Sequence, residues 1–198
     1  MKREYKQIIL LAQPYYLKGR SADKLHHLVV AKMMREMLKD KPGLDKEVMM
    51  AAALLHDIGY AKIPEKERKQ YWAKKVMKDH MIIGAQLAHQ ILKKVKFPKE
   101  KIEKVASIIA AHDNPGLGLK IKSKEGLVLR EADVLWMTTE EAFWLDVGRR
   151  TIQPEEWLEV LEKRFTKEKE YTDYLKTRFS KGKTKAFLKS MKKKLSAL

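Results

Sequence analysis

The sequence predicts an all-α fold in which amphipathic helices enclose a hydrophobic core. Apolar residues recur every three or four positions through most of the 198-residue chain. No segment shows the sustained alternation of apolar and polar residues that is typical of a half-buried strand. Helix-breaking segments, such as Lys41-Pro42-Gly43 and residues 113–118, fall between the periodic stretches. We therefore expect a helical bundle without a substantial sheet.

Capping and stop signals place the first boundaries. Ser21-Ala22-Asp23 offers an N-cap to an apolar-rich helix that extends to about Lys39. Lys41-Pro42-Gly43 then ends this helix, because a proline ring and its missing N–H are incompatible with a helix interior. The sequence thus predicts a helical segment that contains His26 and His27.

The next helix is predicted from its cap and from an uncharged apolar run. Asp45 is placed to cap it, and the helix runs from Val48 to His56-Asp57. It ends near Gly59, because glycine suits the residue that follows a helix. The polar segment Lys62–Lys75 is then expected to form a loop.

Two further helices are predicted around the middle of the chain. Asp79 is expected to cap a helix that continues to about Ile91. Pro98 opens the following helix, since proline is tolerated in the first turn. The apolar stripe of that helix ends in a histidine, and its members are Ile102, Val105, Ile109 and His112.

Helical patterning resumes near Glu125 and continues past Asp133. Further helices are expected at Glu140–Asp146 and from Pro154 to about Lys176. We interpret the large aromatic side chains as core or subunit contacts rather than as platforms for stacked bases, which leaves an oligomer open. They are Trp72, Trp136, Phe143, Trp144 and Trp157.

The positive charge is concentrated at the C-terminus. The chain carries 43 basic and 26 acidic residues, a formal net charge of +17, and residues 174–198 hold nine Lys or Arg and no Asp or Glu. Such a balance favours anionic partners: nucleotides, nucleic acid or acidic lipid. The tail permits an amphipathic helix, interrupted at Gly182, with an apolar face made of Ala186, Phe187, Leu188, Met191 and Leu195. Three interpretations remain open: a docked helix with a solvated lysine face, a non-specific nucleic-acid contact, or a helix on an anionic membrane.

The chain contains no cysteine, so it has no disulfide framework, which is consistent with the cytoplasm. The apolar stretch of residues 8–12 is far too short to span a bilayer, and we expect a cytoplasmic protein without a membrane span. A metal site must then use His, Asp and Glu ligands, which suit Mn, Fe, Co, Ni, Zn or Mg.

Six histidines raise the prospect of such a site. His56-Asp57 alone is best explained as a helix-ending cap, but further histidines lie on separate predicted helices and could line one pocket. His89 is out of phase with His80 and should face away. Periodicity does not choose between His26 and His27, because each belongs to an apolar stripe.

Five short strings together resemble the HD-domain phosphohydrolases. The segment from His26 to Ala31 resembles the H-x-x-x-V-A opening of that superfamily, and Ala52–Gly59 resembles its central A-x-L-L-H-D-I-G signature. The segment His80–Ala85 is similar to the H-x-x-x-G-A element of the two-metal members, while His112 and Ala132-Asp133 match the late His and the final A-D. The resemblance covers roughly residues 20–140, follows the superfamily's order, and selects His26 over His27.

The resemblance implies a helical bundle with one or two divalent metal ions between its helices. It assigns one ion to His26, His56, Asp57 and Asp133, and a second to Asp57, His80 and His112, with Asp57 as the bridge. A metal-activated hydroxide would then attack phosphorus without a nucleophilic side chain. On this basis we expect an HD domain over residues 1–165 and a Lys-rich helical extension over residues 166–198.

Other groups are expected around these ligands. Besides Asp57, the candidates for catalysis are Arg130 and Lys62, which we expect to hold substrate phosphate; Lys24 is a weaker choice. Arg130 stands three residues before Asp133 and hence on the same helix face. Asp113 is a candidate to orient a ligand imidazole or to cap a helix end.

Departures from the family patterns narrow the expected substrate. The chain has His112-Asp113 and Gly116-Leu117-Gly118 where enzymes that cleave cyclic dinucleotides have paired histidines and G-Y-P, and Ile58-Gly59 where alarmone hydrolases have an acidic pair. The layout is similar to the symmetric dinucleoside-polyphosphate hydrolases. We therefore expect a phosphohydrolase acting on a nucleotide or related phosphate ester. The alternatives are a basic nucleic-acid-binding or regulatory protein with a ligand-sensing HD domain, and a di-iron oxygenase of the same superfamily.

Overall fold

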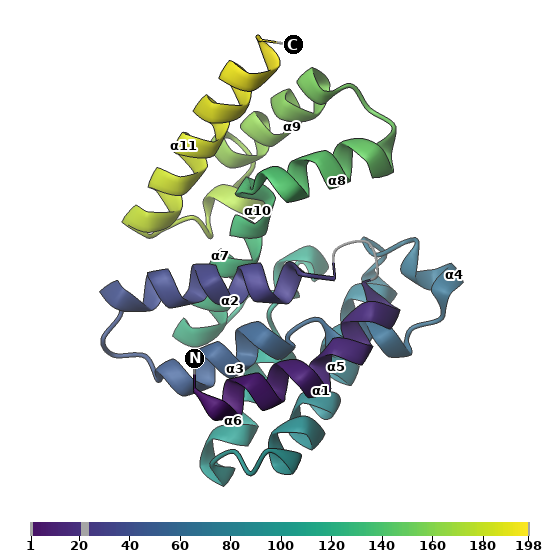
Figure 1. Cartoon of the computed structure of the whole chain (residues 1–198), viewed down its shortest axis with the longest axis vertical. Helices are drawn as coiled ribbons and strands as arrows, with labels where there is room; N and C mark the ends of the chain where they lie inside the picture. The colour runs from purple at the N-terminus through teal and green to yellow at the C-terminus, as the bar shows by residue number, and fades with distance from the viewer. Residues whose placement is uncertain (1, 21–23, 198) are drawn as a thin grey trace.

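The computed structural model describes residues 2–20 and 24–197, and these residues form helices without any strand (Figure 1). The predicted all-α class is confirmed. The α-helices are α1 (Arg3–Gly19), α2 (His26–Met37), α3 (Lys46–Leu55), α4 (Glu65–Arg68), α5 (Lys74–Lys94), α6 (Lys99–Ile109), α7 (Lys124–Val134), α8 (Glu140–Arg150), α9 (Pro154–Thr166), α10 (Lys169–Thr172) and α11 (Arg178–Leu195). Short 3-10 helices are η2 (Leu38–Asp40), η3 (Ile58–Lys62), η4 (Asn114–Leu117) and η5 (Leu135–Thr138).

Two groups of helices lie on opposite sides of α2. Figure 1 places α1, α3, α5 and α6 below α2, and α8, α9, α10 and α11 above it, with α7 between the groups. Within the described ranges, no helix is both long and apolar enough to cross a bilayer. Helices α2, α3 and α7 contact one another. Their contacts matter for the site, because α2 carries His26, His56 directly follows α3, and α7 carries Asp133.

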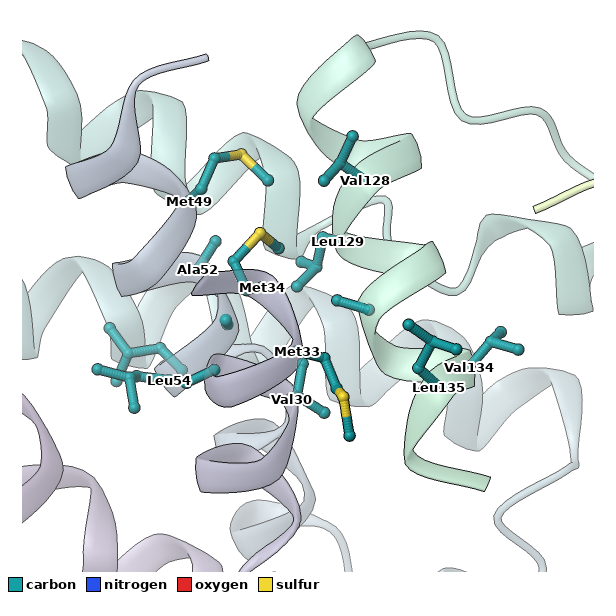
Figure 2. Packing of buried hydrophobic residues seen from close by; sticks show 14 of the residues in the cluster. Val30, Met33, Met34, Met49, Ala52, Leu54, Val128, Leu129, Val134 and Leu135 are labelled. Atoms are coloured by element: carbon teal, nitrogen blue, oxygen red, sulfur yellow. The ribbon is translucent and has the colours of Figure 1, made fainter. Parts of the chain in front are cut away.

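Methionines fill the centre of this packing. Figure 2 shows Met34 of α2 between Met49 of α3 and Leu129 of α7, and all three side chains are fully buried. Met34 and Met49 are flexible enough to fill an irregular gap between helices. The packing fixes the relative positions of three elements before any ligand side chain is considered.

Local signals account for several boundaries. The Asp45 carboxylate accepts hydrogen bonds from the backbone N–H of Glu47 (2.9 Å) and Val48 (3.2 Å), which confirms the predicted cap of α3. Pro98 immediately precedes α6, as expected. The cap predicted at Ser21-Ala22-Asp23 lies outside the described residues.

Other boundaries differ from prediction. The helix predicted to start after Asp79 begins at Lys74, and the Asp79 carboxylate pairs with Lys75 Nζ at 3.1 Å instead of capping. The predicted loop contains the short α4. The single helix expected from Pro154 to Lys176 ends at Thr166, so that α10 turns back and Tyr171 packs edge-on against Phe165, with ring centroids 6.4 Å apart.

Helix α11 is docked on the rest of the molecule. Its buried side chains, among them Phe187, Leu188 and Met191, join the same hydrophobic core as α2, α3 and α7. The helix runs through Gly182 without a break, contrary to prediction, because the helix on both sides is held by this packing. Ala186 was expected on the apolar face but is exposed. The docked-helix interpretation of the tail is therefore the one that the fold supports.

A buried carboxylate joins α7 to the start of α11. Glu131 Oε1 accepts hydrogen bonds from Thr177 N (2.7 Å), Thr177 Oγ1 (2.9 Å) and the Ser180 hydroxyl. An anionic group at a helix N-terminus is stabilising, because it meets the positive end of the helix dipole. Glu131 stands two residues before Asp133, so the C-terminal helix is attached next to a candidate ligand.

Two glycines allow η3 to lie directly against α5. A Cβ added to Gly59 would lie 2.0 Å from the backbone oxygen of His80 and 2.6 Å from the nitrogen of Gly84. A Cβ added to Gly84 would meet the carbonyl oxygen of His56 at 3.1 Å. This close approach of two backbones brings the His56-Asp57 corner beside His80.

Candidate metal centre

Five separate elements supply the six residues that the sequence singled out as metal ligands. His26 begins α2, His56 and Asp57 follow α3, and His80 lies in the second turn of α5. The last two lie after α6 and near the end of α7: His112 and Asp133. The four histidines and Asp57 are at most 4 % exposed, which is unusual for so many polar groups unless they are paired or metal-bound.

One set of donor atoms surrounds Oδ2 of Asp57. His26 Nε2 and His56 Nε2 lie 3.4 and 3.3 Å from this oxygen and 3.0 Å from each other. Asp133 Oδ1 is 3.0 Å from His26 Nε2 and 3.4 Å from His56 Nε2. Four side chains therefore direct nitrogen and oxygen atoms at one point.

A second set surrounds the other oxygen of the same carboxylate. Asp57 Oδ1 lies 3.6 Å from His80 Nε2 and 3.4 Å from His112 Nε2, and these two nitrogens are 3.4 Å apart. Asp113 Oδ2 lies 3.5 Å from His80 Nε2. Asp57 is thus shared by two donor groups, each with the geometry needed to hold an ion.

Backbone carbonyls determine how three of the imidazoles are oriented. The Nδ1–H groups of His56, His80 and His112 donate to the carbonyl oxygens of Ala53 (3.0 Å), Val76 (3.2 Å) and Ile109 (2.8 Å). A carbonyl oxygen accepts only, so Nδ1 keeps its proton and Nε2 is the ring nitrogen that faces the centre; its lone pair is available to an ion when the ring is neutral. Stacking on the Tyr60 ring, at 4.2 Å between centroids, also holds the plane of His80. These orientations match those of metal-ligating histidines.

Opposite charges balance the centre electrostatically. Burial alone would raise the pKa of Asp57, but His56 and Arg20 hold it well below its usual range. Burial lowers the pKa of His56, yet the Asp57 and Asp133 carboxylates outweigh it and raise the pKa to about 10. For His80, burial prevails and lowers the pKa to about 4. In the metal-free protein the Asp57 and Asp133 charges are therefore met by Arg20 and protonated His56.

Arg20 is a site residue that sequence reasoning missed. Its guanidinium forms an ion pair with Asp57 Oδ2, and it lies over the Tyr60 ring at 5.6 Å from the centroid. The contact depends on how α1 packs against η3, so no periodicity or spacing in the sequence indicates it. The positive charge of Arg20 thus contacts Asp57 Oδ2, the same oxygen that faces His26 and His56.

The other predicted residues are distributed in and around the centre. Arg130 is 9 % exposed; its guanidinium pairs with Asp113 and lies 3.4 Å from Asp133 Oδ2. Asp113 is thereby placed between Arg130 and His80. Lys62 and Lys24 are exposed.

The remaining two histidines lie outside the donor groups. His27 stacks on Tyr16 with ring centroids 3.8 Å apart, so the structure directs His26 and not His27 into the centre. His89 pairs with Glu103 at 2.9 Å on the outside of α5, as predicted. Among the aromatic residues, Phe143 and Trp157 are buried in the core, while Trp72 is 63 % exposed and does not belong to it.

Comparison with known proteins agrees with this geometry. The HD domain family model matches residues 25–138, more than half of the chain, and this range includes all six candidate ligands. The chain belongs to the HD domain family. HD domains form a superfamily of metal-dependent phosphohydrolases and bind divalent metal ions. This HD domain ends with η5, so α8–α11 lie beyond the family match, and the predicted division between residues 165 and 166 stays a prediction.

One curated relative is informative but distant. An A-adding tRNA nucleotidyltransferase from Deinococcus radiodurans is 28 % identical over 102 residues. The aligned region covers 48 % of this chain and 22 % of that protein. No solved structure matches the chain significantly.

Proposed function

We propose that this HD domain hydrolyses a nucleotide or related phosphate ester with the help of two divalent ions. The observation that supports it best is the position of Asp57, whose two carboxylate oxygens face two separate pairs of histidine Nε2 atoms. The donor set is entirely imidazole and carboxylate, which fits Mn, Fe, Co, Ni, Zn or Mg. Ions bound there would lower the pKa of a water and offset the charge of the phosphoryl oxygens.

The residues around the donors have separate roles in this proposal. One ion would be held by His26, His56 and Asp133, and the other by His80 and His112. Asp57 would contribute to both sites. Arg130 acts as a positioning residue, because its guanidinium is engaged by Asp113 and lies beside Asp133. Lys62 stands five residues after Asp57, and its side chain is exposed. In this proposal it contacts the phosphate of the substrate.

Phosphate release is the direct test. Purified protein supplied with Mn²⁺ or Co²⁺ is expected to release phosphate from at least one member of a panel of nucleotides, dinucleoside polyphosphates and simple esters. Activity should vanish with a chelator and return when the ion is restored. Metal content is measured in the same samples. No release from any panel member by protein with verified bound metal would contradict the proposal, and oxygen uptake with reduced iron would favour the di-iron oxygenase instead.

Arg20 provides a test of the centre that does not depend on turnover. Arg20→Gln is expected to raise the affinity for Mn²⁺ about tenfold, because the guanidinium competes with the ion for Asp57 and a charge pair of this kind contributes about 1–4 kcal/mol. Calorimetric titration of the metal-free protein measures the change. Lys18→Gln removes the same charge from an exposed site two residues away and should leave the affinity unchanged. A lower affinity in Arg20→Gln would mean that Arg20 orients Asp57 for the ion.

A second candidate function is a nucleic-acid-associated protein. The distant relative is by name an A-adding tRNA nucleotidyltransferase, and the exposed side of α11 is rich in lysine. Turnover with metal distinguishes this candidate from the hydrolase. The two are compatible, because α11 lies outside the donor groups.

A further inference from the structure

A groove of about 600 Å³ runs between α11 and the pair α9–α10, apart from the metal centre. Its volume is within the range of ligand clefts. Lys181, Lys185 and Lys189 form one wall, and Phe165 and Leu188 contribute to an apolar floor. We call it the α9–α11 groove.

The lysine wall is regular along the helix axis. Lys181, Lys185 and Lys189 are four residues apart, so they lie on one face of α11 at intervals of roughly 6 Å. All three are exposed, and among the described residues no acidic side chain pairs with them. Lys192 continues the wall but is paired with Glu162 at 2.6 Å. The wall therefore presents three uncompensated charges in a row.

A buried hydroxyl inside the groove lacks a partner. Thr184 lines the groove, is 6 % exposed, and its Oγ1 has no hydrogen-bond partner among the described residues. An unsatisfied buried hydroxyl costs about 1–3 kcal/mol, a cost that a hydrogen bond to a ligand would offset. The groove thus combines a polar contact point with a charged wall and an apolar floor.

We propose that the α9–α11 groove binds a single strand of nucleic acid, with its phosphates along the lysine wall and a sugar or base against the floor. Proteins that bind single strands combine a positively charged groove with aromatic side chains on which bases stack, and Phe165 is an aromatic residue of this floor. A membrane is a poorer partner, because the large apolar side chains of α11 outside the groove, Phe187 and Met191, are buried against the rest of the protein. This inference does not depend on the metal centre.

The test compares two triple variants that remove the same charge. The probe is a fluorescein-labelled 20-nucleotide oligothymidylate, and anisotropy is measured at several salt concentrations with full-length protein. Changing Lys181, Lys185 and Lys189 to Gln is expected to weaken binding about tenfold or more and to reduce the salt slope by about 2, since each lost contact contributes about 0.7. The control changes Lys176, Lys183 and Lys193, which lie outside the groove lining, to Gln and should have a much smaller effect.

The variant Thr184→Val distinguishes binding in the groove from a general effect of net charge. It should weaken binding while leaving the salt slope unchanged, because the hydroxyl carries no charge. Equal losses in the two triple variants, or unchanged binding by Thr184→Val, would place the strand elsewhere and overturn the proposal. Binding to phosphatidylserine vesicles without binding to the oligonucleotide would overturn it in favour of a lipid surface.

Discussion

Asp57→Asn is expected to leave the protein without either ion and to lower phosphate release by at least about 10²- to 10³-fold. The variant keeps the shape of the side chain but removes the negative charge that both donor groups share. Among the described residues Asp57 is the one that belongs to both donor groups, so the other candidate ligands cannot compensate for its loss. Elemental analysis after reconstitution gives the stoichiometry, and phosphate release gives the activity.

Matched variants make this result interpretable. Asp79→Asn makes the same chemical change next to His80, but Asp79 pairs with Lys75 on the outside of α5, so both ions and activity should remain. His80→Ala should lose one ion only, because His80 belongs to one donor group. Full metal content in Asp57→Asn would contradict the bridging role. Loss of both ions in His80→Ala would indicate that the two sites are not separable.

Gly59→Ala is expected to destabilise the fold by about 3 kcal/mol or more, at the upper end of the cost of overpacking. The added Cβ would lie 2.0 Å from the carbonyl oxygen of His80, so two backbones must separate. For a chain of this length the melting temperature should fall by roughly 6–12 °C. The separation also moves Asp57 away from His80, so the second ion should bind more weakly.

Thermal unfolding followed by circular dichroism measures this effect. Gly43→Ala is the control, because nothing lies within 4 Å of a Cβ at that position. It should change stability by much less than Gly59→Ala. Equal melting temperatures for Gly59→Ala and wild type would mean that η3 and α5 need no close backbone contact.

Local chemistry explains which parts of the fold could be predicted. The cap at Asp45 and the start of α6 after Pro98 depend on residues within a few positions in sequence, and the outward position of His89 follows from its phase relative to His80 on the same helix. The start of α5 at Lys74 has no side-chain cap, and the break after Thr166 accompanies the packing of Tyr171 on Phe165, so neither could be found from periodicity.

The same distinction applies to the candidate site. The order of the six candidate ligands is a sequence property, and the structure brings all six side chains together. The contacts of Arg130 were predicted only in part. Its spacing correctly placed it beside Asp133, but the contact with Asp113 depends on a separate segment that follows α6. Arg20 could not be found at all, because its partner is 37 residues away.

The bonds from three histidine Nδ1 atoms to nearby carbonyl oxygens bear on the entropy of ion binding. Each carbonyl lies three or four residues before its histidine, so ring and acceptor belong to the same short segment of the chain. The rotational freedom of these rings is therefore lost when the chain folds and not when an ion arrives. Such preorganisation favours tight binding with little rearrangement. We expect the chelated protein to keep its helical content, with the rings of His56, His80 and His112 already aimed.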